Sequence, residues 1–290
     1  MTIAPVSKRL RSKLEEISDG LMTLMPDAPI ERRAELDGIL VVAPGCYWGE
    51  LSASLQSKQI ELKREYDSWA ELLLLLFSNA PNDISRDLKG ADSNFRTWSE
   101  LGSNWSLSLD PSKNELNLRE AVQKLEVLID VLDASPCEEM LVIPDTNSLL
   151  SNPDPAEYED VVDGESFTFL LLPTVLGELD QLKLLHRNPD VREKAKKVIG
   201  RIKGWRKQGS LASGITVNRS ITVRTVASEP NMESTLSWLD GEIKDDRIIA
   251  SLLEIEALHP NAIVVHVTGD INLQNKCDAA MVQTAEIENT

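Results

Sequence analysis

Four acidic side chains in this 290-residue sequence occupy positions where they could act together. Asp145 and Asp270 each lie just past the end of a short apolar run, and Glu178 and Asp245 lie near the starts of two segments with helical spacing. Like charges gathered within a few ångströms raise one another's pKa, so such a cluster stays ionised only where cations neutralise it. Mg²⁺ and Mn²⁺ prefer these hard oxygen ligands. A pair of such ions can activate water and stabilise the leaving oxygen of a phosphodiester.

Strands that alternate with helices would position these acids. Short apolar or alternating runs predict strands at 140–143, 167–172, 221–226, 262–267 and 282–287. Helical spacing predicts helices at 175–185, 191–205 and 243–258. This alternation predicts an α/β domain with a mostly parallel sheet. Ligands of open α/β sheets bind outside the carboxyl ends of the strands, where Asp145 and Asp270 are expected.

The first part of the chain has a different pattern. Apolar residues at helical spacing predict helices at 10–24, 51–77 and 115–132. The segment 79–112 is rich in Asp, Asn, Ser and Gly, which predicts a loop with short helical pieces, pinned by Trp98 and Trp105. We therefore expect a helical domain over residues 1–135 and an α/β domain over residues 136–290.

The α/β half resembles the PIN domain family. Four blocks carry the resemblance, in the family's order. Residues 143–150 look like the opening strand with D-T-N, and P-T-V-L-G-E-L-D within 173–183 resembles the family's P-x-x-V-L-x-E-L-D segment. D-D-R-I-I-A at 245–250 resembles D-D/N-R-I-L-A, and residues 268–276 are similar to T-x-D-x-N-L-x-x-K. Each block alone is a weak signal, whereas the ordered set is a strong one. The resemblance spans roughly residues 139–290 and implies a PIN-like, Rossmann-like fold, with a mostly parallel sheet flanked by helices.

The resemblance also implies an activity, namely Mg²⁺- or Mn²⁺-dependent endonuclease action, usually on single-stranded RNA. Carried over by position, the residues that hold the metal are Asp145, Glu178, Asp245 and Asp270. The family pattern selects Asp245 rather than its neighbour Asp246, which then occupies a variable flank.

Three polar residues are implied as supports of this site. Asn147 and Thr268 would orient the acids, and Asn272 would contact either the acids or the substrate. The chain departs from the pattern at Gln274-Asn275, where many relatives carry an arginine that could touch phosphate. This departure concerns the local substrate contact and not the metal site.

Each acid, taken alone, also has a purely structural explanation. Asp145 suits a helix N-cap, and Asp270 suits a turn after Gly269. Glu178 and Asp245 fit the first turns of helices, where the helix dipole favours negative charge. Their joint occurrence in the family's order favours a functional site.

One segment is strongly basic in a chain whose net charge is −17. Between 192 and 207 the only acidic residue is Glu193, and the segment contains eight cations: Arg192, Lys194, Lys196, Lys197, Arg201, Lys203, Arg206 and Lys207. A charge run is usually a solvated helix face. The functional alternative is a strip that follows RNA phosphates toward the acids, with its contacts at Lys194, Lys197, Arg201 and Arg206. Trp205 would either stack on a base or anchor the core.

Composition excludes several other classes of protein. A pI near 4.7 argues against a protein that coats itself on nucleic acid through a general positive field. Three dispersed cysteines without a C-x-x-C pair indicate a reducing, cytoplasmic setting. The sequence shows no signal peptide, and its longest apolar stretch, within 70–77, is too short to span a membrane. The histidines lack zinc spacing, and His266, in an apolar strand, is expected in the core.

These observations favour a metal-dependent endoribonuclease that hydrolyses single-stranded RNA. Two rivals stay open: a catalytically silent PIN-fold protein that binds nucleic acid or acts as a scaffold, and a structure-specific DNA nuclease. A toxin of a toxin–antitoxin pair is less favoured, because the chain is longer than compact stand-alone toxins. The N-terminal helical region would regulate access, choose the substrate or bind a protein partner, and a homodimer is also left open.

Overall fold

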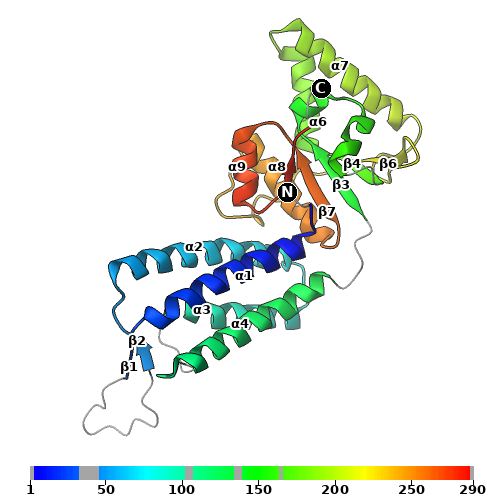
Figure 1. The fold of residues 1–290 in the computed structure, drawn as a ribbon. Coiled ribbons are helices and arrows are strands. Elements are labelled where there is room, and N and C mark those ends of the chain that lie inside the picture. The colour runs from blue at the N-terminus through cyan, green and yellow to red at the C-terminus, as the bar shows by residue number, and fades with distance from the viewer. Residues whose placement is uncertain (1–2, 33–45, 102–106, 134–138, 163–165, 288–290) are drawn as a thin grey trace. The chain divides into compact units, whose positions relative to one another are not determined.

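The computed structural model describes residues 3–32, 46–101, 107–133, 139–162 and 166–287 (Figure 1). By their contacts, these residues form two units. One unit contains the chain from Ser7 to Ala134, and the other contains the residues up to Val6 together with those from Ser135 onwards. Each unit is considered by itself below.

The unit from Ser7 to Ala134 is helical, with one small hairpin. Its helices are α1 (Val6–Leu24), α2 (Ala53–Leu76), α3 (Asn82–Ser99) and α4 (Pro111–Leu132), and a short 3₁₀ turn, η1 (Met25–Asp27), follows α1. The hairpin pairs β1 (Ile30–Arg32) with β2 (Cys46–Trp48). The three helices predicted here are confirmed. The indole Nε1 of Trp69 donates to the Leu10 carbonyl at 2.9 Å, which fixes α2 against α1.

The predicted loop over 79–112 is wrong, because most of it is the regular helix α3. Its buried residues Leu88, Ala91, Phe95 and Trp98 recur at steps of three and four. Burial of this apolar stripe outweighs the weak helix propensity of the Asp, Asn and Ser residues around it. Trp98 does anchor the segment, since its ring packs edge-on against Trp48 at 6.5 Å. Trp105 lies outside the described residues.

The second unit is built on a six-stranded sheet in the order β5-β6-β4-β3-β7-β8. The strands are β3 (Met140–Pro144), β4 (Phe167–Leu171), β5 (Ile215–Thr216), β6 (Ile221–Thr225), β7 (Ile263–Val267) and β8 (Thr284–Ala285). Every neighbouring pair runs parallel except β5 and β6. The predicted mixed α/β fold with a mostly parallel sheet is therefore confirmed (Figure 1).

Helices flank this sheet. They are α5 (Thr146–Ser151), α6 (Pro173–Leu185), α7 (Pro189–Arg206), α8 (Lys244–Leu258) and α9 (Ile271–Ala279), with the 3₁₀ turn η2 (Pro155–Val162). Every residue of β4 is buried, as expected for a parallel strand covered on both faces. The ring of Phe169 packs edge-on against buried Tyr158 at 4.8 Å, so η2 closes part of the core.

The order of the strands places the acids. The central strand β3 has β4 on one side and β7 on the other, so the order in which successive strands are added to the sheet reverses at β3. Pro144 at the end of β3 pairs with Val267 at the end of β7. The residues that follow, Asp145 and Thr268, therefore leave the sheet side by side. The crevice at such a switch point is the usual ligand site of open α/β sheets.

Candidate active site

Asp145 is fixed by bonds to both of its carboxylate oxygens. It caps the N-terminus of α5, where Oδ1 accepts a bond from the Ser148 amide at 2.6 Å. Its Oδ2 accepts a bond from the Thr268 hydroxyl at 2.7 Å, and the whole side chain is buried. The capping role and the link across the sheet are thus combined in one residue.

Thr268 connects Asp145 to Asp270. The hydroxyl oxygen of Thr268 accepts a bond from the Asp270 amide at 3.1 Å while it donates to Asp145. Asp270 is exposed and caps α9, with Oδ1 accepting a bond from the Asn272 amide at 2.8 Å. Gln274 donates its side-chain amide to the Thr268 carbonyl at 3.0 Å, which closes the turn.

Glu178 reaches the same region from α6. Its Oε2 accepts a bond from the Thr146 hydroxyl at 2.8 Å, and Thr146 directly follows Asp145. Its Oε1 lies 3.1 Å from the ammonium of Lys244, at the start of α8. Three elements, α5, α6 and α8, are therefore joined through this one carboxylate.

Asp245 and Asp246, in the first turn of α8, have different surroundings. Asp246 is buried, and its two oxygens accept bonds from Lys276 Nζ at 2.6 Å and from the Asp240 amide at 2.9 Å. Asp245 is more open, with its Oδ2 3.8 Å from Lys276 Nζ.

The carboxylate of Asp245 lies within electrostatic range of three other acids. Burial raises the pKa of its carboxyl, and the negative charges of Asp270, Asp246 and Glu178 raise it further, against the lowering effect of Lys276. Carboxylates remote from one another in the chain thus repel one another in one region of the fold.

The donor chemistry of this cluster fits a hard divalent cation, although the described side chains do not form a finished cage. Within the described ranges, no three His, Cys, Asp or Glu side chains gather closely enough to hold a metal ion. The ammonium groups of Lys244 and Lys276 lie against Glu178 and Asp246 instead. The cluster nevertheless offers only oxygen donors, carries mutually repelling charges and already attracts cations, which are the properties of Mg²⁺ and Mn²⁺ sites.

The polar supports differ in part from those expected. Thr268 lies where it was predicted and bonds to Asp145. The side chains of Asn147 and Asn272 are exposed in the first turns of α5 and α9. The hydroxyl that holds Glu178 belongs to Thr146, which the sequence analysis did not single out. Lys276 was also missed, although it is the final position of the fourth family block.

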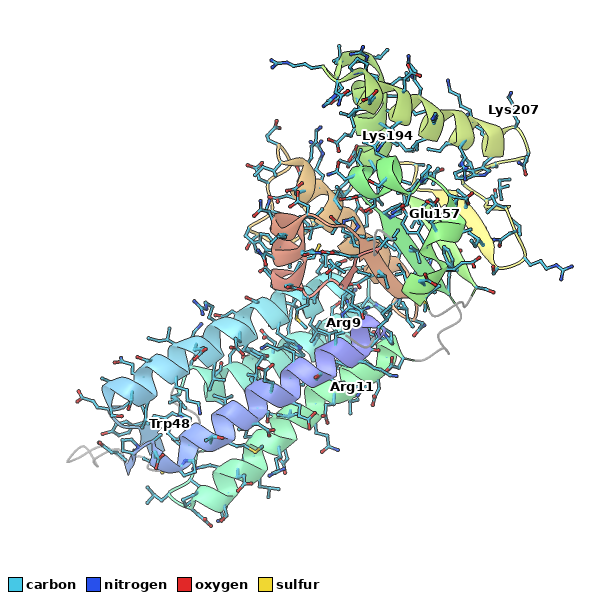
Figure 2. The ribbon with its side chains drawn as sticks, turned by 45° about the horizontal axis from the view of Figure 1, so that its top comes forward. Arg9, Arg11, Trp48, Glu157, Lys194 and Lys207 are labelled. Carbon is cyan, nitrogen blue, oxygen red and sulfur yellow. The ribbon has the colours of Figure 1, made fainter. Side chains whose placement is uncertain are left out.

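The cations of the basic segment project from α7. Ala195 and Val198 face inward, and Lys194, Lys197, Arg201 and Arg206 are exposed. Figure 2 marks Lys194 in the first half of the helix and Lys207 just after its end. The segment is partly neutralised, since Glu193 pairs with Lys196 at 2.6 Å and Asp154 pairs with Arg201 at 2.6 Å. Trp205 is half-buried.

Comparison with known proteins agrees with this geometry. A family model described as PIN domain matches residues 142–288, just over half of the chain and nearly all of the α/β unit. No curated protein matches the chain. Members of this family are generally nucleases that act on nucleic acid and typically bind divalent metals. Among the described helices, none combines the length and apolarity needed to cross a membrane. The family match and the parallel sheet with its acidic edge agree, and the chain belongs to the PIN domain family.

Proposed function

We propose that this protein is a divalent-metal-dependent endoribonuclease that hydrolyses phosphodiester bonds in single-stranded RNA. The residues that would hold Mg²⁺ or Mn²⁺ are Asp145, Glu178, Asp245 and Asp270. One observation carries the proposal: at the carboxyl edge of the sheet Thr268 bonds to both Asp145 and Asp270, and Thr146 bonds to Glu178. The fourth acid, Asp245, lies within electrostatic range of Asp270 and Glu178. When bound, the metal would supply Lewis-acid stabilisation of charge and an activated water.

The surrounding side chains would hold these acids in place before the metal binds. Thr268 fixes Asp145 and the start of α9 together, so the acids that follow β3 and β7 keep one spacing. The Thr146 hydroxyl, next to Asp145 in the chain, likewise orients the carboxylate of Glu178. Such fixed orientation lowers the reorganisation needed when charge develops at the phosphate.

Cleavage of labelled single-stranded RNA tests the proposal. The assay compares Mg²⁺, Mn²⁺ and EDTA for the full chain, Asp145→Asn, Asp270→Asn and a control, Asp180→Asn. Asp180 is exposed and lies on the same helix as Glu178, but it pairs with Lys183. We expect cleavage that needs metal, falls by about a hundredfold or more in the first two variants and persists in the control. Cleavage that continues in EDTA or in both site variants would refute the proposal.

A second comparison separates Asp245 from Asp246. We expect Asp245→Asn to lose metal-dependent cleavage with little change in stability, because this side chain is half-exposed. Asp246→Asn should lower stability by about 1–3 kcal/mol, since Lys276 and the Asp240 amide lose a buried charged acceptor. If instead Asp246→Asn abolishes cleavage without unfolding while Asp245→Asn stays active, the metal ligand is Asp246.

The proposed role of α7 is to bind RNA phosphates. Glutamine replacing Lys194, Lys197, Arg201 and Arg206 together should weaken RNA binding and flatten its salt dependence, by about 0.7 in the log–log slope for each lost phosphate contact. The matched control neutralises exposed cations of the helical unit: Lys89, Lys113, Arg119 and Lys124. An equal effect of the two sets would show that only net charge matters.

The lysines in the acidic cluster favour a second candidate, a PIN-fold protein that binds nucleic acid without cutting it. Lys244 and Lys276 already supply positive charge to Glu178 and Asp246. RNA binding without cleavage at any Mg²⁺ or Mn²⁺ concentration would select this candidate. Competition between single-stranded RNA and branched DNA in the same assay distinguishes a structure-specific DNA nuclease.

A further inference from the structure

Three large apolar side chains are exposed beside the acidic cluster. Ile271 directly follows Asp270 and is 70% exposed, and Ile243, two residues before Asp245, is 44% exposed. Trp238, in the loop that leads into α8, is 43% exposed. Exposing apolar surface costs roughly 25 cal/mol for each Å², and apolar side chains gathered at one surface commonly mark a binding site.

The loop that carries Trp238 is tied to both helices of the cluster. The Asp240 amide, two residues after Trp238, donates to the buried Asp246 carboxylate at 2.9 Å. Lys276 of α9 bonds the other oxygen of the same carboxylate at 2.6 Å. Because two residues of chain span at most about 7 Å, the backbone at Trp238 lies within reach of the first turn of α8.

The exposure of Trp238 is built into an ordered loop. Leu236 is buried, and the Leu239 amide donates to its carbonyl at 3.1 Å. Arg247 holds the other end of the loop through a 2.9 Å bond to the Gly241 carbonyl. A side chain at Gly241 would come within 3.2 Å of Met232, so the turn is closely packed. The fold therefore presents the indole to solvent in a fixed setting.

An indole is suited to one part of a nucleic acid. The acidic cluster repels phosphates unless cations are present, whereas the face of an aromatic ring attracts a base without charge. Stacking of a base on an aromatic side chain contributes about 1–3 kcal/mol and needs a base that is free of its own pair.

We propose that Trp238 stacks on an unpaired base of the substrate next to the acidic cluster, with Ile243 and Ile271 covering the base or sugar at its edges. This inference rests on the proposed nuclease function and deepens it, because it assigns the preference for single strands to a residue. Stacking reads the π face of a base, so single-stranded RNA and single-stranded DNA of one sequence should both depend on Trp238.

Binding of fluorescently labelled single strands, measured in the Asp145→Asn background, tests the inference without cleavage. Trp238→Ala should raise the dissociation constant about tenfold, and Trp238→Phe should recover most of the loss. The control is Leu258→Ala, which removes another exposed apolar side chain at the far end of α8. Thermal unfolding of each variant checks that the fold is retained.

A double-mutant cycle identifies the stacked base. Single abasic sites are placed along the strand, and the one that weakens binding as much as Trp238→Ala should cause no further loss in that variant. Additive losses at every position, or unchanged binding by Trp238→Ala, would overturn the inference while metal-dependent cleavage by the parent protein still supported the function. If binding depends on Trp238 but the parent protein never cleaves RNA, the stacking inference stands and the proposed nuclease function fails. Loss of binding to duplex and single strand alike would also overturn it.

Discussion

His266 gives the sharpest stability prediction, because a buried imidazole must stay neutral in the folded protein. The ring lies in β7 and is fully buried, and its Nδ1 is 2.8 Å from the Ile143 carbonyl. Its Nε2 is buried and has no hydrogen-bond partner among the described residues. Burial lowers the pKa of His266 from 6.5 to about 4, although the charge of Asp145 and the bond to Ile143 act in the opposite direction.

The sign of the pH dependence follows from this shift. Between the two pKa values the unfolded chain binds a proton that the folded chain does not, so the free energy of unfolding rises with pH. The stabilising contribution is complete above about pH 6.5 and is lost as the pH falls toward 4. From pH 7.5 to pH 5, His266 should account for a loss of about 2 kcal/mol.

The variant His266→Asn should remove this slope. Asparagine places an amide N–H near the position of Nδ1 but carries no titratable group. The control is His259→Asn, since His259 is exposed at the end of α8. Chains are equilibrated in urea at several pH values, and a brief deuterium pulse at a common pH reports the fraction in which β7 is protected. Comparing variants cancels the titration of the carboxylates, which acts on all of them.

An unchanged slope in His266→Asn would refute the reasoning. It would mean that the buried imidazole either is not charged on unfolding in this range or finds an acceptor for its second proton in the folded state. If His259→Asn reduced the pH dependence of the unfolding free energy as much as His266→Asn, the effect would come from the overall charge of the chain and not from the buried ring.

Four further single substitutions have expected outcomes. Lys244→Gln should lower the Mn²⁺ concentration that gives half-maximal cleavage, because Glu178 loses a competing cation 3.1 Å away, and an unchanged requirement would contradict this. Gly204→Ala should raise stability by about 0.5–1 kcal/mol in urea unfolding, since a methyl group there meets open space. Gly214→Ala should lower it, because the backbone φ is +95° and Thr222 lies 2.9 Å from the new carbon; equal effects of the two would contradict the reasoning. Phe169→Ala should cost about 3–5 kcal/mol, and a loss under 1 kcal/mol would mean that the core collapses around the site.

The strands that carry the acids could be predicted because their signal is local. β3, β4 and β7 are buried on both faces and therefore appear in the sequence as short continuous apolar runs. The acids that follow β3 and β7 then share one edge of the sheet by topology alone. Helix α3 was missed because its apolar stripe is spread among polar residues typical of loops.

The side chains that hold the acids could not be predicted in the same way. Thr146 and Asn147 are adjacent at the start of α5, and successive helical residues point about 100° apart. Which of the two side chains bonds to Glu178 depends on where α6 packs, and in the structure it is Thr146. The partners of Lys276 likewise lie thirty positions away in the chain, at Asp246. Such pairs are set by tertiary packing, which a single sequence does not display.

The hydrogen bonds between Ala4 and Gln283 affect where this protein can be truncated to isolate the α/β unit. The buried Gln283 side chain accepts from the Ala4 amide at 2.7 Å and donates to the Ala4 carbonyl at 2.6 Å, as a neighbouring strand would. A fragment that starts at residue 135 keeps the whole family match but leaves this carboxamide without its backbone partner, at a cost of about 1–3 kcal/mol for each unsatisfied group. The α/β unit is thus discontinuous in the sequence, and an excised version should also contain the residues up to Val6.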